Sequence, residues 1–367
     1  MVALTRQLDP SRKVTVGLFP ARERFVKEWE HWDDHDTFLN AEPAEMAFHC
    51  DVVSWNYTEN MFAPDHARCP QLMFIASESA CNIGLGDRPP SWTEIDTDYV
   101  IGHYHGSAYD YLGESAKPKR GGGRALIDLS GWVTPLGRYY QSCYSDAPLV
   151  HLMVTETDEA QGARFNNRGG SRWDWYPLVD HWNWGDRKEA KVTTFTNAEE
   201  VELVLNGKSV GRQRLADCRG RIMNWELPYE PGTLTALARN NGQLVAEHTL
   251  TTPGEPVELR LTPSTPELIA DGLDVLCVEA ARLDAEGILV PGCGKKVTFE
   301  VEGPAVNAGV ASGDVVSDEL WQGDTRSTWN RRCILLVRAG RSSGEVVVTA
   351  KAEGQSPARC ALRATAP

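Results

Sequence analysis

The first 145 residues contain four short apolar runs in which hydrophobic and polar side chains do not alternate. The runs are 14–19 (VTVGLF), 51–57 (DVVSWNY), 72–78 (LMFIASE) and 99–104 (YVIGHY). Strands buried on both faces of a parallel sheet have such sequences, whereas half-exposed strands alternate. Segments long enough for crossover helices lie between the runs, at 21–35 and 43–49. The pattern therefore predicts an α/β arrangement.

After about residue 146 the pattern changes to short, evenly spaced strands. The strands expected up to residue 253 are 190–196, 201–205, 207–212, 222–227 and 232–238. Turn signals separate them, among them Asn206-Gly207 and Pro231-Gly232. This spacing is typical of an antiparallel β-sandwich.

A second series of strands fills the last part of the chain. They are expected at 257–261, 275–283, 296–301 and 345–351, with a hairpin turn at 284–287. The segment 251–256 (TTPGEP) is a suitable linker between the two sandwiches. We therefore predict three domains, at residues 1–145, 146–253 and 254–367.

The charge and the cysteine pattern exclude several functional classes. The chain has 37 Lys and Arg against 51 Asp and Glu, a formal net charge of -14, so nucleic acid is not an expected partner. None of the nine cysteines forms a CxxC pair, which favours free thiols over a zinc or redox site. His103 and His105 lack a third ligand at useful spacing, so neither a metal nor another cofactor is predicted.

Two further features concern location and ligand class. No apolar run reaches the ~20 residues of a membrane span, and the first twelve residues lack a signal-peptide core. We therefore expect no membrane contact and a cytoplasmic location, or a periplasmic or secreted one if the N-terminus is truncated. The 12 Trp residues suit either sugar stacking or core packing.

The third run carries the most informative polar group. Glu78 follows the apolar residues 72–76, and a carboxylate at the end of a buried strand is costly unless it is paired or used. The second run ends in Asn56 and Tyr57, and the fourth leads to His105 and Asp110. In α/β barrels such side chains converge on one rim, which forms the active site. A buried structural role for Glu78 is the alternative.

Several ordered motifs resemble the β-galactosidase side of glycoside hydrolase family 2. Residues 8–15 (LDPSRKVT) resemble the family's LDPTRPVT segment, and 74–79 (FIASES) is similar to its GSE segment. Residues 109–114 (YDYLGE), 127–131 (IDLSG) and 139–142 (YYQS) resemble the motifs that follow barrel strand eight. Residues 180–184 (DHWNW) and 202–211 (ELVLNGKSVG) resemble the sandwich domain that follows the barrel.

The resemblance implies a fold and a mechanism. The fold would be the C-terminal half of a (β/α)8 TIM barrel, strands five to eight, followed by two immunoglobulin-like β-sandwiches. Glu78 matches the family's nucleophile, which forms a covalent glycosyl-enzyme in a retaining hydrolase. Tyr57 would hydrogen-bond Glu78, and Asn56, His105 and Asp110 would contact hydroxyl groups of a carbohydrate substrate.

The sequence departs from the family in two respects. The acid/base of the family lies in a GNE motif before the LDPTR segment, and no such motif occurs in this chain. Glu42, in the sequence NAEP, is interpreted as a solvated helix-start residue. His105 replaces a Trp that usually forms the floor of the sugar subsite.

The missing half-barrel and the missing acid/base leave alternatives open. An N-terminal partner chain or a homo-oligomer would complete the barrel. A second alternative is an inactive fragment, or a carbohydrate-binding or scaffold protein, derived from such an enzyme. A third is a gene that extends upstream of the given sequence.

Overall fold

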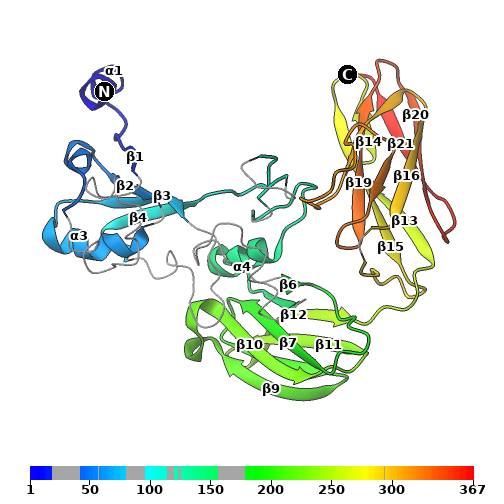
Figure 1. The fold of residues 1–367 in the computed structure, drawn as a ribbon, viewed down its shortest axis with the longest axis horizontal. Coiled ribbons are helices and arrows are strands. Elements are labelled where there is room, and N and C mark those ends of the chain that lie inside the picture. Colours follow the sequence, from blue (N-terminus) through cyan, green and yellow to red (C-terminus); the bar gives the residue numbers. More distant parts are fainter. Residues whose placement is uncertain are drawn as a thin grey trace. The chain divides into compact units, whose positions relative to one another are not determined.

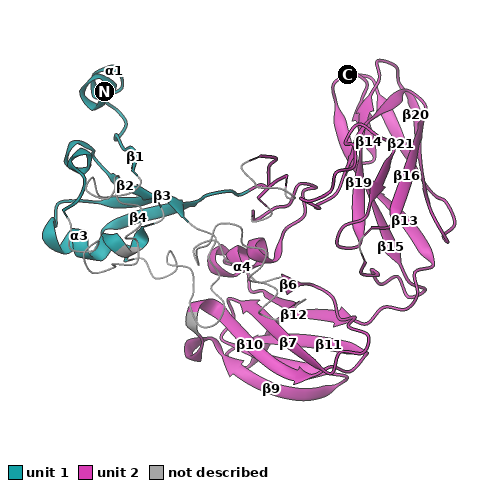
Figure 2. Cartoon of the chain, viewed as in Figure 1, with its two compact units in different colours: residues 1–108, 157–177 teal, residues 109–156, 178–367 magenta. Residues whose placement is uncertain are grey.

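The computed structural model describes residues 1–18, 42–56, 58–79, 96–113, 120–122, 125–155, 178–292 and 294–367. The chain separates into two compact units, one of residues 1–108 and 157–177 and the other of residues 109–156 and 178–367 (Figure 2). The expected boundaries near residues 145 and 253 stay a prediction.

The first unit is built on a parallel sheet whose described strands lie in sequence order (Figure 1). They are β1 (Gly17–Leu18), β2 (Val53–Asn56), β3 (Phe74–Ser79) and β4 (Val100–His105). The accompanying helices are α1 (Val2–Leu8), η3 (Glu45–His49), η4 (Glu59–Met61) and α3 (Phe62–Arg68). The parallel sheet expected from the non-alternating runs is confirmed.

Two details of this unit differ from the expectation. The segment 43–49 forms only the five-residue 3-10 helix η3 instead of a crossover helix, because so few residues cannot offset the cost of helix nucleation. Strand β4 exposes Ile101 and Tyr104, so it is not buried on both faces.

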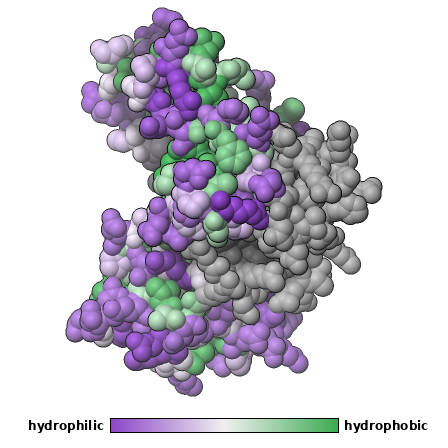
Figure 3. Space-filling view, turned by 90° about the vertical axis from the view of Figure 1, so that its left-hand side faces the viewer, coloured by the Kyte–Doolittle hydropathy of each residue, from purple (hydrophilic) through white to green (hydrophobic). Residues whose placement is uncertain are grey.

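Figure 3, in which the left-hand side of Figure 1 faces the viewer, shows hydrophobic residues in patches among hydrophilic ones. The predicted helix at 21–35 lies outside the described residues.

The core of the first unit holds β2 in place. Trp55 and Phe74 are fully buried between the sheet and α3, and Phe62 of α3 lies 5.3 Å from Phe74, measured between ring centroids. Trp55 Nε1 also donates a hydrogen bond to the buried Asp65 carboxylate, at 3.1 Å. Trp55 is therefore a core residue, with its N–H satisfied inside the unit.

The first sandwich of the second unit encloses one core between two antiparallel sheets. One sheet contains β5 (Val150–Thr155), β6 (Leu178–Val179), β7 (Glu189–Thr196) and β10 (Ile222–Pro228). The other contains β8 (Glu200–Leu205), β9 (Lys208–Arg214), β11 (Thr233–Asn240) and β12 (Gln243–Thr251). The short 3-10 helices η8 (Leu215–Asp217) and η9 (Arg219–Arg221) precede β10. Trp182 is fully buried in this core.

Helix α4 (Pro135–Tyr144) packs against this sandwich. Its first turn is capped by Thr134, whose hydroxyl accepts a hydrogen bond from Gly137 N at 3.2 Å. The buried Tyr139 donates its hydroxyl proton to Gly220 O at 2.7 Å and lies edge-on to Phe195. The helix therefore packs on the face of the β5–β7 sheet that is turned away from the core between the two sheets.

The terminal sandwich has the same layered construction around a second core. One sheet contains β13 (Glu258–Pro263), β15 (Val275–Leu283), β17 (Ala305–Ala311) and β19 (Arg332–Ala339). The other contains β14 (Glu267–Ile269), β16 (Lys296–Glu302), β18 (Thr325–Ser327), β20 (Gly344–Ala352) and β21 (Ala358–Thr365). The expected turn at 284–287 is confirmed, since Gly287 N donates to Asp284 O at 3.1 Å.

Among the helices of the described ranges, none combines the length and the hydropathy that a membrane span requires. The seven cysteines that fall within these ranges, such as the buried Cys333, are free thiols.

Candidate functional site

Glu78 lies at the carboxyl end of β3, where the register of the sheet is irregular. Trp55 of β2 pairs with Ala76, whereas the next residue, Asn56, pairs with Glu78. Ser77 is therefore an extra residue on β3. A bulge of this kind redirects the side chains that follow it. In this sheet it brings the Glu78 carboxylate beside the side chain of Asn56.

A short hydrogen-bond chain fixes the orientation of the carboxylate. Asn56 Nδ2 donates to Glu78 Oε2 at 3.3 Å. The side-chain oxygen of Asn56, Oδ1, in turn accepts a hydrogen bond from the Ser77 hydroxyl. Because that oxygen is already engaged, the amide N–H group is the part of Asn56 that faces Glu78. The bulge residue Ser77 therefore helps to orient the donor that holds Glu78.

Glycine on the neighbouring strand leaves room for the carboxylate. Gly106 follows β4, and its N–H donates to Ser79 O at 3.2 Å, which extends the pairing of β4 with β3. A Cβ atom at Gly106 would lie 3.2 Å from Glu78 Oε1 and 3.3 Å from Glu78 Cγ. Most side-chain contacts are looser than this, so a larger residue would push the carboxylate aside.

Three of the five predicted site residues lie at the carboxyl ends of neighbouring strands. Asn56 ends β2, Glu78 is the next-to-last residue of β3, and His105 ends β4 opposite Ser79. Tyr57 lies outside the described residues, so its expected hydrogen bond to Glu78 stays a prediction.

Asp110 is described within the second unit. It is 7% exposed, and its N–H donates to Ile127 O at 2.8 Å. The structure therefore shows a buried side chain and a hydrogen-bonded backbone N–H at this position but does not place Asp110 relative to Glu78.

His103 lies two residues before His105 on the same strand. Burial lowers the pKa of His103 below its ordinary value, because desolvation disfavours the charged imidazolium. The sheet beneath the Glu78 rim therefore has a neutral imidazole at pH 7.

Sequence reasoning did not identify Ser77 and Gly106 as parts of the site. Both follow from the strand register, which the sequence does not contain. A glycine directly after the polar end of the fourth run was the available signal for Gly106, because glycine often marks close backbone approach.

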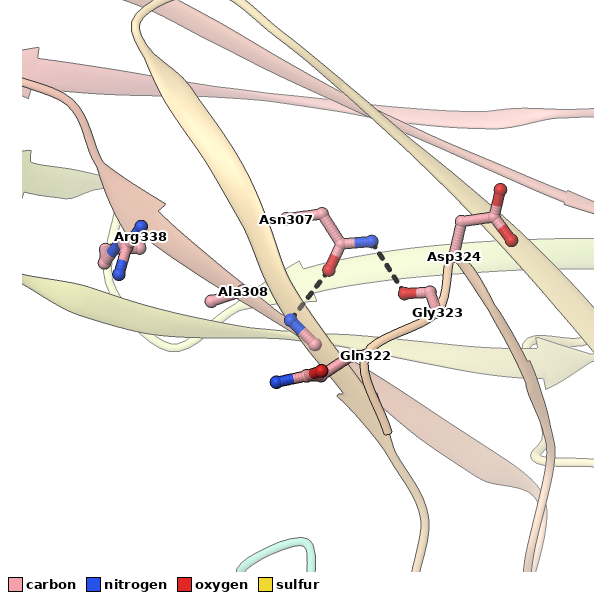
Figure 4. A pocket seen from close by; sticks show the side chains of 7 residues that line it. Asn307, Ala308, Gln322, Gly323, Asp324 and Arg338 are labelled. Atoms are coloured by element: carbon pink, nitrogen blue, oxygen red, sulfur yellow. Dashed lines mark hydrogen bonds between the residues drawn. The ribbon is translucent and has the colours of Figure 1, made fainter. Parts of the chain in front are cut away.

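A separate groove of about 700 Å³ lies on the terminal sandwich, at the edge strand β17 (Figure 4). Its lining residues are Asn307, Ala308, Gly309, Gln322, Gly323, Asp324 and Arg338. Asn307 fixes its wall, since its Nδ2 donates to Gly323 O at 3.0 Å and its Oδ1 accepts from Gly309 N at 2.8 Å. This groove belongs to the second unit and includes none of the predicted site residues.

Within the ranges that the structure describes, no group of three or more His, Cys, Asp or Glu side chains is placed to hold a metal ion. The Glu78 site consists of a carboxylate, an amide and a hydroxyl. That combination suits acid–base or nucleophilic chemistry by the carboxylate.

Comparison with known proteins relates this arrangement to carbohydrate-cleaving enzymes. The family described as glycoside hydrolase family 2 C-terminal domain 5 matches residues 259–361, and a domain of unknown function matches residues 187–246. A β-galactosidase of Bacteroides ovatus is 33% identical over 285 residues, which are 76% of this chain and 30% of that protein. A putative β-glucuronidase of Formosa agariphila is 28% identical over 238 residues, 60% of this chain and 20% of that protein.

The solved structures agree with this relationship. A family 2 glycosyl hydrolase from Bacteroides cellulosilyticus superimposes with a TM-score of 0.83 and 29% identity, covering 99% of this chain and 46% of that one. The chain thus spans less than half of that structure and less than a third of the curated relatives named above. The sequence motifs, the family match and the shared fold together show that this chain belongs to glycoside hydrolase family 2.

Proposed function

We propose that this chain provides the nucleophile of a retaining, β-galactosidase-like glycoside hydrolase that cleaves terminal β-glycosidic bonds. The observation that carries the proposal is the placement of Glu78. Its carboxylate lies at the carboxyl end of a parallel strand, held by Asn56 at 3.3 Å and packed against the backbone of Gly106. Active sites of α/β barrels are formed at this end of the strands.

The proposed scaffold is half of a (β/α)8 barrel followed by two immunoglobulin-like sandwiches. The four parallel strands in sequence order support the first part, with β1 to β4 as barrel strands five to eight. Both β1 and β4 are edge strands of the described sheet, and unpaired edges invite further strand pairing. We propose that an N-terminal segment, a partner chain or a second copy supplies the remaining strands.

The proposed reaction has two steps. A carboxylate oxygen of Glu78 attacks the anomeric carbon, and the bond from that carbon to the leaving-group oxygen breaks as an acid protonates this oxygen. Water then attacks the same carbon, gives its proton to the conjugate base and releases Glu78, so the configuration is retained. The hydrogen bond from Asn56 holds the carboxylate in one orientation throughout, which favours in-line attack.

The acid/base carboxyl is proposed to lie outside residues 1–367, about 5–5.5 Å from Glu78 in the complete site. The family motif that carries it has no counterpart in this sequence. Without that group, the rate with substrates that need protonation of the leaving group would fall by about 10²–10⁴-fold. Glycosyl fluorides, which lose fluoride without protonation, should be affected least.

The sugar is proposed to be galactose, since the relative with 33% identity is named a β-galactosidase. Relatives named β-glucuronidases make a glucuronide the competing substrate. Asn56 and His105 at the strand ends supply hydrogen-bonding groups for hydroxyls of either sugar.

Covalent labelling of Glu78 tests the proposal directly. A 2-deoxy-2-fluoro-β-galactosyl fluoride should add one glycosyl group to Glu78, measured by peptide mass spectrometry on this chain and on a version extended at its N-terminus. The Glu78→Gln variant should remain unlabelled. The matched control is Glu45→Gln, because Glu45 is an exposed glutamate of the same unit, with 82% of its side chain accessible.

The same experiment separates the proposal from its alternatives. Labelling by the glucuronyl analogue instead would change the sugar but keep the mechanism. Binding of galactosides with neither labelling nor turnover in both versions, unchanged in Glu78→Gln, would contradict the proposal and favour a carbohydrate-binding or scaffold protein.

A further inference from the structure

The segment that leads from β4 to α4 is attached to the terminal sandwich, although the two are far apart in the sequence. We call residues 109–113, 120–122 and 125–134 the connector. Its Arg120 N–H donates to Val315 O of the sandwich at 2.7 Å. Its Trp132 Nε1 donates to Glu279 Oε2, on β15, at 2.9 Å. Both a backbone and a side-chain contact therefore tie the connector to this domain.

Trp132 is part of a closed three-residue cluster. The guanidinium carbon of Arg332, on β19, lies 4.4 Å from the centroid of the Trp132 ring. Arg332 Nη1 also donates to Glu279 Oε2 at 3.3 Å. Each member of the cluster thus contacts both others, through a charge-assisted hydrogen bond, an indole hydrogen bond and a cation–π contact. The Glu279 and Arg332 side chains are 24% and 21% exposed, so water screens these contacts only in part.

The backbone around Trp132 is folded to present it. Asp128 Oδ1 accepts hydrogen bonds from Ser130 N at 2.8 Å and from Trp132 N at 3.0 Å, and Asp128 N donates to Trp132 O at 2.9 Å. The sandwich approaches this turn closely, because a Cβ atom at Gly313 would lie 2.5 Å from Asp128 Oδ2. The turn and the sandwich therefore fit together without space for a side chain between them.

The same turn is joined to Asp110. Ile127, next to Asp128, accepts a hydrogen bond from Asp110 N at 2.8 Å and bridges to Tyr109. Asp110 is 7% exposed, and a Cβ atom at Gly122 would lie 3.5 Å from its Oδ1. In the sequence, Asp110 is five residues beyond His105, the last residue of β4. A fixed Trp132 turn therefore fixes the backbone of Asp110.

We infer that the Trp132–Glu279–Arg332 cluster of the terminal sandwich is a positioning device that holds the Asp110 part of the connector in place. The three residues act through Ile127 and Asp128 and do not themselves contact a sugar. The inference rests on the proposed function in one respect, the expectation from the family resemblance that Asp110 contacts a hydroxyl group of the sugar. It assigns the terminal sandwich a role in ordering the chain that leaves the barrel strands.

Hydrogen exchange of single variants tests the inference without any need for catalysis. Glu279→Ala removes the acceptor shared by Trp132 and Arg332, and Glu279→Gln keeps an oxygen that accepts from the indole. The matched control is Glu300→Ala, whose carboxylate pairs with Lys351 on the same sandwich and is 50% exposed. We expect exchange at the amides of Asp110 and Trp132 to rise on the order of 10-fold in Glu279→Ala. It should rise less in Glu279→Gln and not at all in the control.

Three results would overturn the inference. Unchanged exchange at Asp110 in Glu279→Ala would show that the cluster does not hold the connector. If Glu279→Ala unfolds the sandwich itself, the test uses Trp132→Phe instead. This variant keeps a ring for Arg332 but removes the indole N–H. Unchanged exchange at the Asp110 amide in Trp132→Phe would refute the inference. Full loss of protection in Glu279→Gln, equal to that in Glu279→Ala, would refute the role of the indole hydrogen bond.

Sugar kinetics then separate positioning from simple domain packing. In a glycosyl fluoride assay, Glu279→Ala should raise KM several-fold relative to Glu300→Ala while kcat changes little, because Asp110 is expected to bind a sugar hydroxyl and not to take part in bond cleavage. An unchanged KM with a loosened connector would refute the positioning role. If neither the unsubstituted chain nor its N-terminally extended version is labelled or turns over a glycoside, the proposed function fails, and the exchange result alone decides whether the cluster holds the connector.

Discussion

Asp65 is expected to control the stability of the sheet that carries Glu78. Its carboxylate is fully buried under β2, where it accepts a hydrogen bond from Trp55 Nε1 at 3.1 Å and from Arg68 Nη1 at 3.2 Å. Trp55 directly precedes Asn56, the donor to Glu78. Replacing Asp65 with Ala should therefore weaken the sheet and, through β2, the orientation of Glu78.

The cost follows from the groups that would be left without this acceptor. Removing one partner of a buried ion pair typically costs about 3–5 kcal/mol. The Arg68 side chain is 26% exposed and reaches water in part. We therefore expect Asp65→Ala to lower the free energy of unfolding by the smaller of these amounts, about 3 kcal/mol. Asp65→Asn keeps an oxygen for the Trp55 N–H and loses only the charge, so it should cost about 1–2 kcal/mol.

Urea-dependent hydrogen exchange in peptides from β2 and β3 measures these differences within the first unit. Asp98→Ala is the matched control, since Asp98 is an exposed aspartate of the same unit and should cost less than about 0.5 kcal/mol. The reasoning would be wrong if Asp65→Ala cost no more than Asp98→Ala. It would also be wrong if Asp65→Asn cost as much as Asp65→Ala.

Three other outcomes are expected. Burial lowers the pKa of His151 and of His181 to about 4, so below pH ~6.5 the unfolded chain takes up protons that the folded sandwich does not. The free energy of unfolding should then fall by roughly 2 kcal/mol per histidine between pH 6.5 and 4, after allowance for partial exposure; urea midpoints that do not change over this range would contradict it. Gly106→Ala should slow labelling of Glu78 about 10-fold or more without changing the urea midpoint of the first unit, because its Cβ would lie 3.2 Å from the carboxylate. Arg331→Ala, which leaves Asp180 without its ion-pair partner, should cost about 2 kcal/mol in urea unfolding of the second unit; a loss below about 0.5 kcal/mol would show that the pair is solvated.

Strands bounded by strong turn signals were predictable from the sequence. The hairpin at Asn206-Gly207 is an example, because both residues have positive φ, 49° and 78°, and Leu205 pairs with Lys208 across it. Asn and Gly are the residues that tolerate this backbone conformation. The expected strand at 275–283 coincides with β15 for the same reason, since the turn at 284–287 ends it.

Two strands were missed because their hydrophobic pattern is weak or ambiguous. Strand β12 (Gln243–Thr251) follows a turn at Asn241-Gly242, where both residues have positive φ. It is an edge strand with few buried side chains, so its sequence lacks a clear hydrophobic period. Strand β19 (Arg332–Ala339) has three consecutive buried side chains, Cys333, Ile334 and Leu335, and a short apolar run of this kind is not distinguishable from a buried helix by periodicity. Strand β19 is fixed by pairing with β15 and β17, which are distant in the sequence, and one sequence contains no record of such pairing.

The candidate site shows the same division between what is local and what is long-range. The position of Glu78 near the end of a buried strand followed from the chain itself, and the resemblance to the family gave its proposed role. Its orientation depends on one extra residue, Ser77, in the pairing of β3 with β2. Side chains alternate between the two faces of a strand, so a shift of one residue reverses the face on which every later side chain lies. Without the bulge, Glu78 would not lie opposite Asn56. The geometry of the candidate site is therefore a property of the pairing between two strands, which no property of Glu78 alone predicts.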